Sequence, residues 1–132
     1  AYSDAFGAEL AIVAKHRVSA TKVEAMNVIG DVEGKDAFLI DDMTETGGTL
    51  CAAAKILKAS GARRIFAGVS HAVIEDHARK RILESDIEEL ITTDSVPMAH
   101  GEKITPLSVA PLFGEAIRRI HNGESVTSLF DI

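Results

Sequence analysis

The stretch that decides the fold is Ala37–Phe38–Leu39–Ile40–Asp41–Asp42–Met43–Thr44–Glu45–Thr46–Gly47–Gly48–Thr49–Leu50. It begins with a short apolar run, which is typical of a buried parallel strand, and a helix-forming run over residues 50–59 follows its glycines directly. Open α/β sheets bind ligands beyond the carboxyl ends of such strands. The order of strand, carboxylate pair, glycine turn and helix therefore predicts a ligand site at this strand end.

The turn itself favours two kinds of ligand group. Its glycines let the backbone approach a ligand closely, and the first turn of the following helix offers unpaired N–H groups and a positive dipole end to a phosphate. Thr46 and Thr49 add hydroxyl donors. Asp41 and Asp42 repel a phosphate but suit sugar hydroxyls, or a Mg²⁺ held through water. Both features in one site predict a phosphorylated sugar as the ligand.

The remaining sequence alternates between strand and helix patterns. The pattern predicts the end of a helix over 2–9, strands over 10–14, 23–32, 36–42, 64–71, 87–93 and 104–109, and helices over 48–60, 75–85 and 111–121. Strands that alternate with helices imply an α/β fold, with a mostly parallel twisted sheet covered by helices on both faces. The 132 residues suffice for a single domain over residues 1–132 with a full core.

Composition narrows the class of protein. A net charge of −6 and a pI of about 5.3 argue against a nucleic-acid binder, which normally shows a basic face. The single cysteine, Cys51, excludes an internal disulfide and fits a reducing compartment. No apolar run reaches the roughly 18 residues of a membrane span, and no signal peptide is visible. We therefore expect a cytoplasmic protein that binds neither nucleic acid nor a membrane.

Three smaller features can be interpreted from the residue types alone. The basic run Lys15–His16–Arg17 is, by itself, typical of a solvated surface loop. Cys51 is expected to be packed among small residues, although a helix N-terminus nearby would lower its pKa and make the thiol reactive. The run Arg79–Lys80–Arg81 indicates a solvated helix face or a subunit contact.

Several segments together resemble a known family. Residues 41–49 are similar to the phosphoribosyl pyrophosphate signature of type I phosphoribosyltransferase folds. The segments Glu24–Val32, Leu107–His121 and Gly123–Phe130 resemble ribose-phosphate pyrophosphokinases (phosphoribosyl pyrophosphate synthetases) in particular. The resemblance runs along essentially the whole chain and implies a phosphoribosyltransferase-like fold.

The resemblance implies a ribose-phosphate diphosphokinase, which transfers the diphosphoryl group of ATP to the anomeric hydroxyl of ribose 5-phosphate with Mg²⁺. The residues implied for ribose 5-phosphate are Asp41, Asp42, Glu45, Thr46, Gly47, Gly48 and Thr49. Within this set, residues 46–49 would hold the 5-phosphate, and the two aspartates would take the ribose hydroxyls directly or through the metal. No other metal ligand is assigned within the chain.

Further roles follow from the same resemblance. Lys15 and Arg17 fall where the family carries a Lys-x-Arg motif on a mobile catalytic loop. Two cations on such a loop can close over the substrates, exclude water and stabilise developing charge. Ser125, Thr127 and Ser128 are candidate contacts for a regulatory phosphate. The family also implies a homo-oligomer, a dimer or a hexamer, with active sites between subunits.

The chain departs from the family in sequence and in length. Glu45 stands where an aspartate is usual, Val18 stands where a proline is common, and Glu75–Asp76–His77–Ala78 lacks the Ser-Gly-Pro-like turn often found there. Family members contain two related domains, and we expect this chain to correspond to the second, with the N-terminal half absent. Because that half would supply much of the ATP site, the chain alone is expected to bind ribose 5-phosphate weakly and without turnover.

Two alternatives share the same loop. One is a non-catalytic regulatory or associated subunit of the same fold, against which the presence of Lys15 and Arg17 argues. The other is a different phosphoribosyltransferase, which would use the loop to bind phosphoribosyl pyrophosphate rather than to make it. That reaction needs a nucleobase-recognition element, and we find none in the sequence.

Overall fold

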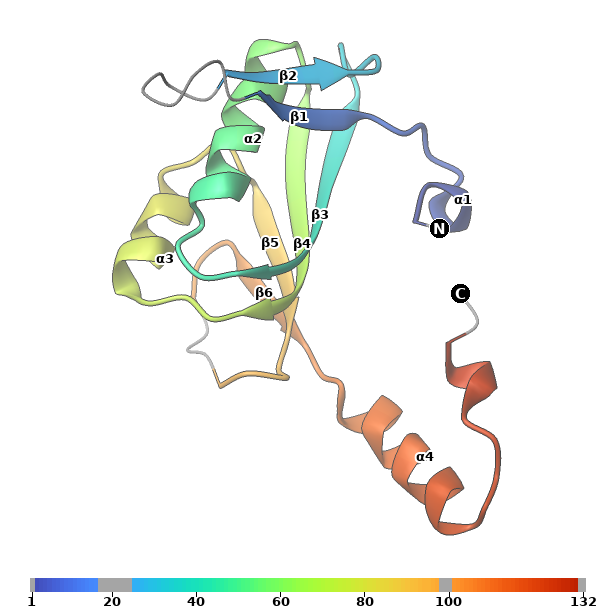
Figure 1. Ribbon diagram of the computed structural model, residues 1–132. Coiled ribbons are helices and arrows are strands. Elements are labelled where there is room, and N and C mark those ends of the chain that lie inside the picture. The colour runs from blue at the N-terminus through green and yellow to red at the C-terminus, as the bar shows by residue number, and fades with distance from the viewer. Residues whose placement is uncertain (1, 17–24, 98–100, 131–132) are drawn as a thin grey trace.

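The computed structural model describes residues 2–16, 25–97 and 101–130 (Figure 1). Its elements are, in chain order, α1 (Tyr2–Phe6), β1 (Ile12–His16), β2 (Ala25–Ile29), β3 (Asp36–Thr44), α2 (Gly48–Ala59), β4 (Arg64–Ala72), α3 (Asp76–Leu83), β5 (Glu89–Thr93), β6 (Ile104–Leu107), α4 (Ala110–His121) and the 3-10 helix η1 (Thr127–Leu129). The predicted strands and helices are all present, with ends that shift by a few residues. No helix in these ranges is both long enough and apolar enough to cross a membrane.

Strands β3, β4, β5 and β6 form a parallel four-stranded sheet in that order. Strands β1 and β2 form a separate antiparallel pair, in which Lys15 pairs with Met26 and His16 with Ala25. Helices α2 and α3 lie together on one side of the four-stranded sheet (Figure 1). This arrangement confirms the predicted α/β fold with a mostly parallel sheet flanked by helices.

The core lies between the four-stranded sheet and the helices α2 and α3, and it is aliphatic. Ile65 on β4, Leu90 on β5 and Ile82 on α3 are fully buried. They belong to one cluster with Leu50 and Leu57, which lie on the inward face of α2. Burial of this apolar stripe is what holds α2 and α3 against the sheet.

The opposite face of the sheet differs from the prediction, because among the described helices only the short α1 contacts it, through the edge contact of Phe6 with Phe38. Along β3, Phe38 and Ile40 point to this face and are 45% and 40% exposed. Among the described strands, β3 pairs with β4 alone and so lies at an edge of the sheet. The prediction of a strand buried on both faces is therefore wrong for the described residues, although the partly buried positions Ala37 and Leu39 do pack against the core.

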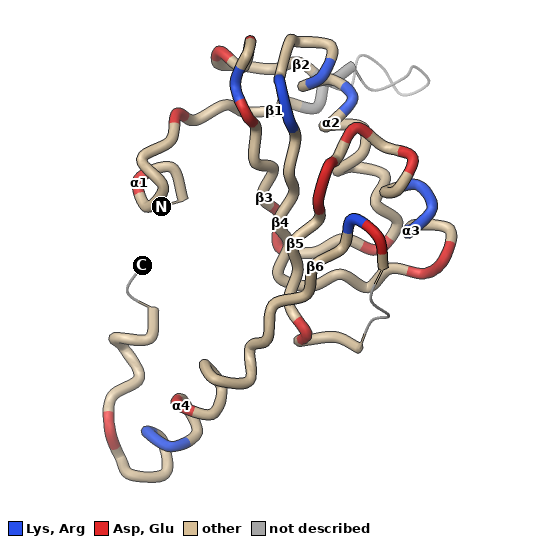
Figure 2. The backbone as a smooth tube through the Cα atoms, turned by 180° about the vertical axis from the view of Figure 1, so that it is seen from behind, with Lys and Arg blue, Asp and Glu red and all other residues tan. Residues whose placement is uncertain are grey.

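Helix α4 extends away from the sheet, and none of its residues is buried (Figure 1). Its apolar side chains Leu112, Phe113, Ile117 and Ile120 are between 49% and 68% exposed. The segment from β6 through the first turn of α4 carries no charged residue, as Figure 2 shows. The apolar face predicted for this helix exists, but it has no partner among the described residues.

Candidate functional site

The predicted ligand loop lies where expected, at the carboxyl end of β3 and directly before α2. β3 ends at Thr44, and α2 begins at Gly48. Gly47 precedes the helix in the left-handed region, with φ 67° and ψ −1°. Only glycine enters this region without strain, so the turn depends on that residue.

Hydroxyl groups within the loop accept hydrogen bonds from the N–H groups of both glycines, of which only Gly48 belongs to the helix. The Gly47 N–H donates to Thr44 Oγ1 at 3.2 Å, and this bond is buried. The Gly48 N–H donates to Thr46 Oγ1 at 3.3 Å, in an exposed position. The next two residues, Thr49 and Leu50, lie in the first helical turn, where the N–H groups have no intrahelical carbonyl to reach. The prediction of unpaired N–H groups therefore applies to that turn and not to the two glycines.

Asp41 and Asp42 stand near the end of β3, and both are exposed. Asp41 Oδ1 accepts the N–H of Asp42 at 3.0 Å, and Asp42 Oδ1 accepts the N–H of Met43 at 2.7 Å. Because water reaches both carboxylates, neither of them needs a cation to offset burial of its charge. Exposure instead leaves these carboxylates open to a ligand, and Glu45 is exposed in the same way.

Asp41 also lines a shallow cavity of about 180 Å³ on the open face of the sheet. Phe38 and Ile40 of β3, Ser70 of β4 and Thr93 of β5 contribute to the same cavity. The cavity runs from the apolar middle of the sheet to the edge where the parallel strands end. Its polar residues are therefore on the side on which an α/β sheet binds its ligand.

A hydroxyl network occupies the neighbouring strand ends. His71 Nδ1 and Ser95 Oγ share a hydrogen bond of 2.7 Å, and Thr93 Oγ1 donates to the Ser70 carbonyl at 2.6 Å. His71 pairs in register with Met43, so this network lies beside the end of β3. Periodicity placed these residues at strand ends, but nothing in the sequence indicated that their side chains meet.

Helix α3 forms the back of the loop, which the sequence did not indicate. A Cβ atom added to Gly47 would lie 3.1 Å from Ile82 Cγ1. Arg81 Nη1 donates to the Thr46 carbonyl oxygen at 2.8 Å. Arg81 is exposed, as expected for a solvated helix face, but its guanidinium also contacts a loop 35 residues earlier in the chain.

The two predicted catalytic cations are only partly described. Lys15 lies in β1, and Arg17 lies outside the described residues. The pairing of His16 with Ala25 fixes where the intervening segment leaves and rejoins the hairpin. The role of this pair of cations stays a prediction.

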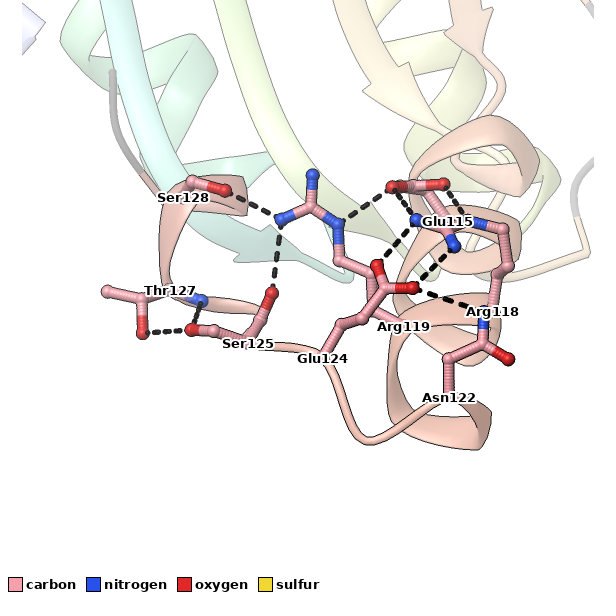
Figure 3. Close-up of polar contacts among 8 residues, drawn as sticks. All are labelled: Glu115, Arg118, Arg119, Asn122, Glu124, Ser125, Thr127 and Ser128. Carbon is pink, nitrogen blue, oxygen red and sulfur yellow. Dashed lines mark hydrogen bonds and ion pairs between the residues drawn. The ribbon is translucent and has the colours of Figure 1, made fainter.

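The residues predicted to contact a regulatory phosphate come together beside α4 (Figure 3). Arg119 Nη1 donates to Ser128 Oγ at 2.6 Å and to the Ser125 carbonyl at 3.1 Å. Ser125 Oγ donates to Thr127 Oγ1 at 3.0 Å. Glu115 accepts hydrogen bonds from Arg118 and Arg119, which lower the pKa of its carboxyl to about 2. This network joins the C-terminal turn to the last two turns of the helix.

The remaining candidate groups show no catalytic arrangement. Burial raises the pKa of the Cys51 thiol, and its Sγ donates to the Arg81 carbonyl oxygen at 3.8 Å. The packed interpretation of this cysteine is therefore confirmed over the reactive one. Within the part of the chain that the structure describes, no three His, Cys, Asp or Glu residues come together to hold a metal ion.

Comparisons with known proteins agree with the geometry. The model of the phosphoribosyl synthetase-associated domain matches residues 8–131. A ribose-phosphate pyrophosphokinase of Helicobacter hepaticus is 50% identical over 131 residues, which are 98% of this chain and 42% of that protein. One of Vibrio cholerae is 47% identical over 127 residues, which are 93% of this chain and 40% of that protein.

A solved structure gives the same result for the fold. The phosphoribosylpyrophosphate synthetase of Mycobacterium smegmatis superposes with a TM-score of 0.84 at 33% identity, over 92% of this chain and 40% of that one. The chain thus spans about two fifths of the length of the proteins it matches. Its correspondence to the second of two related domains stays a prediction. The resemblance read from the sequence is confirmed, and the chain belongs to the phosphoribosyl synthetase-associated domain family.

Proposed function

We propose that this chain is the ribose 5-phosphate-binding part of a ribose-phosphate diphosphokinase. That enzyme transfers the diphosphoryl group of ATP to the anomeric hydroxyl of ribose 5-phosphate and so makes phosphoribosyl pyrophosphate. The observation that carries the proposal is the loop between β3 and α2. Gly47, in the left-handed region, leads into the helix, and Asp41 and Asp42 lie just upstream in β3. The names of the relatives support the reaction.

In this proposal, residues 46–49 hold the 5-phosphate. The first turn of α2 supplies N–H groups and the positive end of the helix dipole, and the Thr49 hydroxyl is exposed beside them. The Gly48 N–H bond to Thr46 Oγ1 is long, at 3.3 Å, and exposed. A phosphate oxygen is a stronger acceptor than a hydroxyl and can replace it as the partner of that N–H.

Asp41 and Asp42 would bind the ribose hydroxyls, directly or through Mg²⁺. The two backbone bonds described above use only Oδ1 of each aspartate, and an ionised carboxylate has about four acceptor positions. Exposed carboxylates suit a Mg²⁺ that keeps several of its waters. When bound there, the metal would neutralise phosphate charge, and the aspartates would orient the sugar toward the diphosphoryl donor.

Lys15 and Arg17 would act on the transferred group. Phosphoryl transfer depends mainly on positioning and on cations at the developing charge. The β1–β2 pair holds both ends of the segment that carries Arg17, since His16 and Ala25 are partners. We further propose a homo-oligomer, a dimer or a hexamer, as the functional unit.

Ser125, Thr127 and Ser128 would contact a regulatory phosphate. Arg119 brings a positive charge to within 2.6 Å of Ser128 Oγ, so the hydroxyls and the guanidinium offer donors to one anion. If inhibition by nucleotide diphosphate or activation by phosphate in the full-length protein is unchanged by S128A and T127A together, this role is excluded.

Calorimetry with the 132-residue chain tests the substrate assignment. We expect binding of ribose 5-phosphate, weaker binding of inorganic phosphate and still weaker binding of ribose. The variants D41N and D42N should weaken ribose 5-phosphate binding about tenfold each, because each removes a charge-assisted contact. The matched control G114A changes a glycine that has no neighbouring atom within 4 Å and should bind like the parent chain.

Turnover requires a second experiment, in a protein of the relatives' length that contains this chain. With ATP and Mg²⁺, that protein should form phosphoribosyl pyrophosphate, whereas the 132-residue chain alone should not. K15A and R17A should reduce kcat strongly and leave the Kd of ribose 5-phosphate nearly unchanged. Equal binding of ribose and ribose 5-phosphate to the chain would contradict the proposal.

A further inference from the structure

Two adjacent residues of α3, Arg81 and Ile82, contact the ligand loop. The buried side chain of Ile82 lies behind Gly47, 3.1 Å from the position of an added Cβ. The exposed guanidinium of Arg81 lies in front of it, and Nη1 is 3.4 Å from the position that a Cβ on Gly48 would take. The same nitrogen donates to the Thr46 carbonyl oxygen at 2.8 Å.

These contacts fix both ends of a single peptide group. The carbonyl of Thr46 and the N–H of Gly47 belong to one planar unit and must turn together. Arg81 holds the carbonyl oxygen at 2.8 Å, and the Thr44 hydroxyl accepts the N–H at 3.2 Å. One anchor comes from the end of β3 and the other from α3, so the peptide is tied between two elements of the core.

The orientation of this peptide matters for an anion. A glycine can change φ at little steric cost, so the Thr46–Gly47 peptide can rotate at its Gly47 end unless other contacts hold it. If it rotated by half a turn, the partial negative charge of the carbonyl oxygen would point toward the bound phosphate. The N–H that Thr44 now accepts would leave its buried partner, which carries a desolvation penalty.

We propose that Arg81 is a positioning residue for the phosphate loop. It holds the Thr46 carbonyl away from the anion and keeps the N–H groups of the following helical turn directed at it. Arg81 acts through the peptide and does not itself contact the reacting atoms. This role rests on the proposed function, namely that residues 46–49 bind the 5-phosphate of ribose 5-phosphate.

The chain offers a matched control on the same helix. Lys80 is next to Arg81 and has the same charge, but its Nζ pairs with Glu84 Oε1 at 3.8 Å, one turn along α3. R81A and K80A therefore remove the same charge from adjacent positions of α3, but only R81A removes a hydrogen bond to the loop. R81K keeps the charge and loses the planar guanidinium, so it should recover part of the function.

The test measures ribose 5-phosphate binding by calorimetry and Gly47 amide exchange by NMR, in the parent chain, R81A, R81K and K80A. We expect R81A to raise the Kd about tenfold or more, since a hydrogen bond to a charged donor is lost. We expect R81K to fall between R81A and the parent, and K80A to stay within about twofold of the parent. The Gly47 amide should exchange faster in R81A than in K80A, while core amides of β4 keep their protection.

Two results would overturn the proposal, and they are distinguishable from failure of the proposed function. If R81A binds ribose 5-phosphate as the parent does, Arg81 does not contribute to binding. If K80A weakens binding equally, Arg81 contributes only its charge. If R81A loses protection across β4 as well, its effect is on folding and not on the loop. If the parent chain itself does not bind ribose 5-phosphate, the proposed function fails first, and the role of Arg81 fails with it.

Discussion

Glu115 and Arg119, one turn apart in α4, are joined by a hydrogen bond of 2.7 Å from Nε to Oε1. The same guanidinium reaches Ser128 Oγ at 2.6 Å through Nη1 (Figure 3). A single arginine thus ties the helix to the turn that follows it. Since α4 buries none of its residues in this chain, polar contacts of this kind are what define the conformation of the C-terminal segment.

The Glu115 carboxyl should therefore titrate far below its ordinary pKa of 4.5. Hydrogen bonds from Arg118 and then Arg119 lower that pKa to about 2. A lowered carboxyl pKa stabilises the folded segment above pH 4.5, and this stabilisation is lost as the pH falls through about 2. NMR titration of the carboxyl carbon measures it. R118A/R119A should return the pKa toward 4.5, and an unchanged value in that double variant would exclude the two arginines as the cause.

Replacing Thr44 by valine should destabilise the chain and weaken phosphate binding. Thr44 is only 8% exposed, and its Oγ1 is the acceptor for the Gly47 N–H. Valine keeps the shape but leaves the N–H without that partner, at a cost of about 1–3 kcal/mol in the free energy of unfolding. Urea denaturation measures this change. T44S keeps the hydroxyl and should lose clearly less, so similar losses in both variants would point to packing instead.

Alanine should have opposite effects at Gly47 and Gly114. At Gly47, a Cβ meets Ile82 Cγ1 at 3.1 Å in a residue with φ 67°, which carries a penalty of about 1–2 kcal/mol or more. At Gly114, inside α4, the Cβ meets no atom within 4 Å, and helix propensity favours alanine by about 0.5–1 kcal/mol. Thermal unfolding should show a lower midpoint for G47A than for the parent chain. Circular dichroism should show unchanged or higher helix content for G114A. A neutral G47A would show that the loop tolerates another conformation.

Cys51 should react slowly with thiol-specific alkylating reagents at pH 7. The thiolate is the nucleophile, and burial raises the pKa of this thiol and so reduces its ionised fraction. Mass spectrometry after iodoacetamide treatment follows the rate. The rate should rise in denaturant, where the thiol is exposed, and also in the folded chain as the pH approaches 9. A folded chain that reacts faster than the denatured one would show that the N-terminus of α2 dominates over burial.

Local pattern was sufficient for the elements and for the ligand loop. The period of two in β4 and the helical period in α2 are set by neighbours in sequence, so both could be read directly. The loop between Thr44 and Thr49 could also be read, because the left-handed turn requires glycine and the helix start creates free N–H groups wherever it occurs. For the same reason, the family could be identified from short segments.

The tertiary structure alone decided which surfaces meet. Whether an amphipathic strand is covered on one face or both depends on the path of other elements, and Phe38 and Ile40 stay 45% and 40% exposed although Phe6 contacts Phe38. The partner of the Thr46 carbonyl is Arg81, 35 residues away, and it was indistinguishable in the sequence from its neighbour Lys80. Sequence by itself determined that a glycine turn, for which we propose phosphate binding, stands between β3 and α2. Only the packing of α3 against Gly47 determined what holds that loop in shape, because such contacts depend on distances in space that no local pattern encodes.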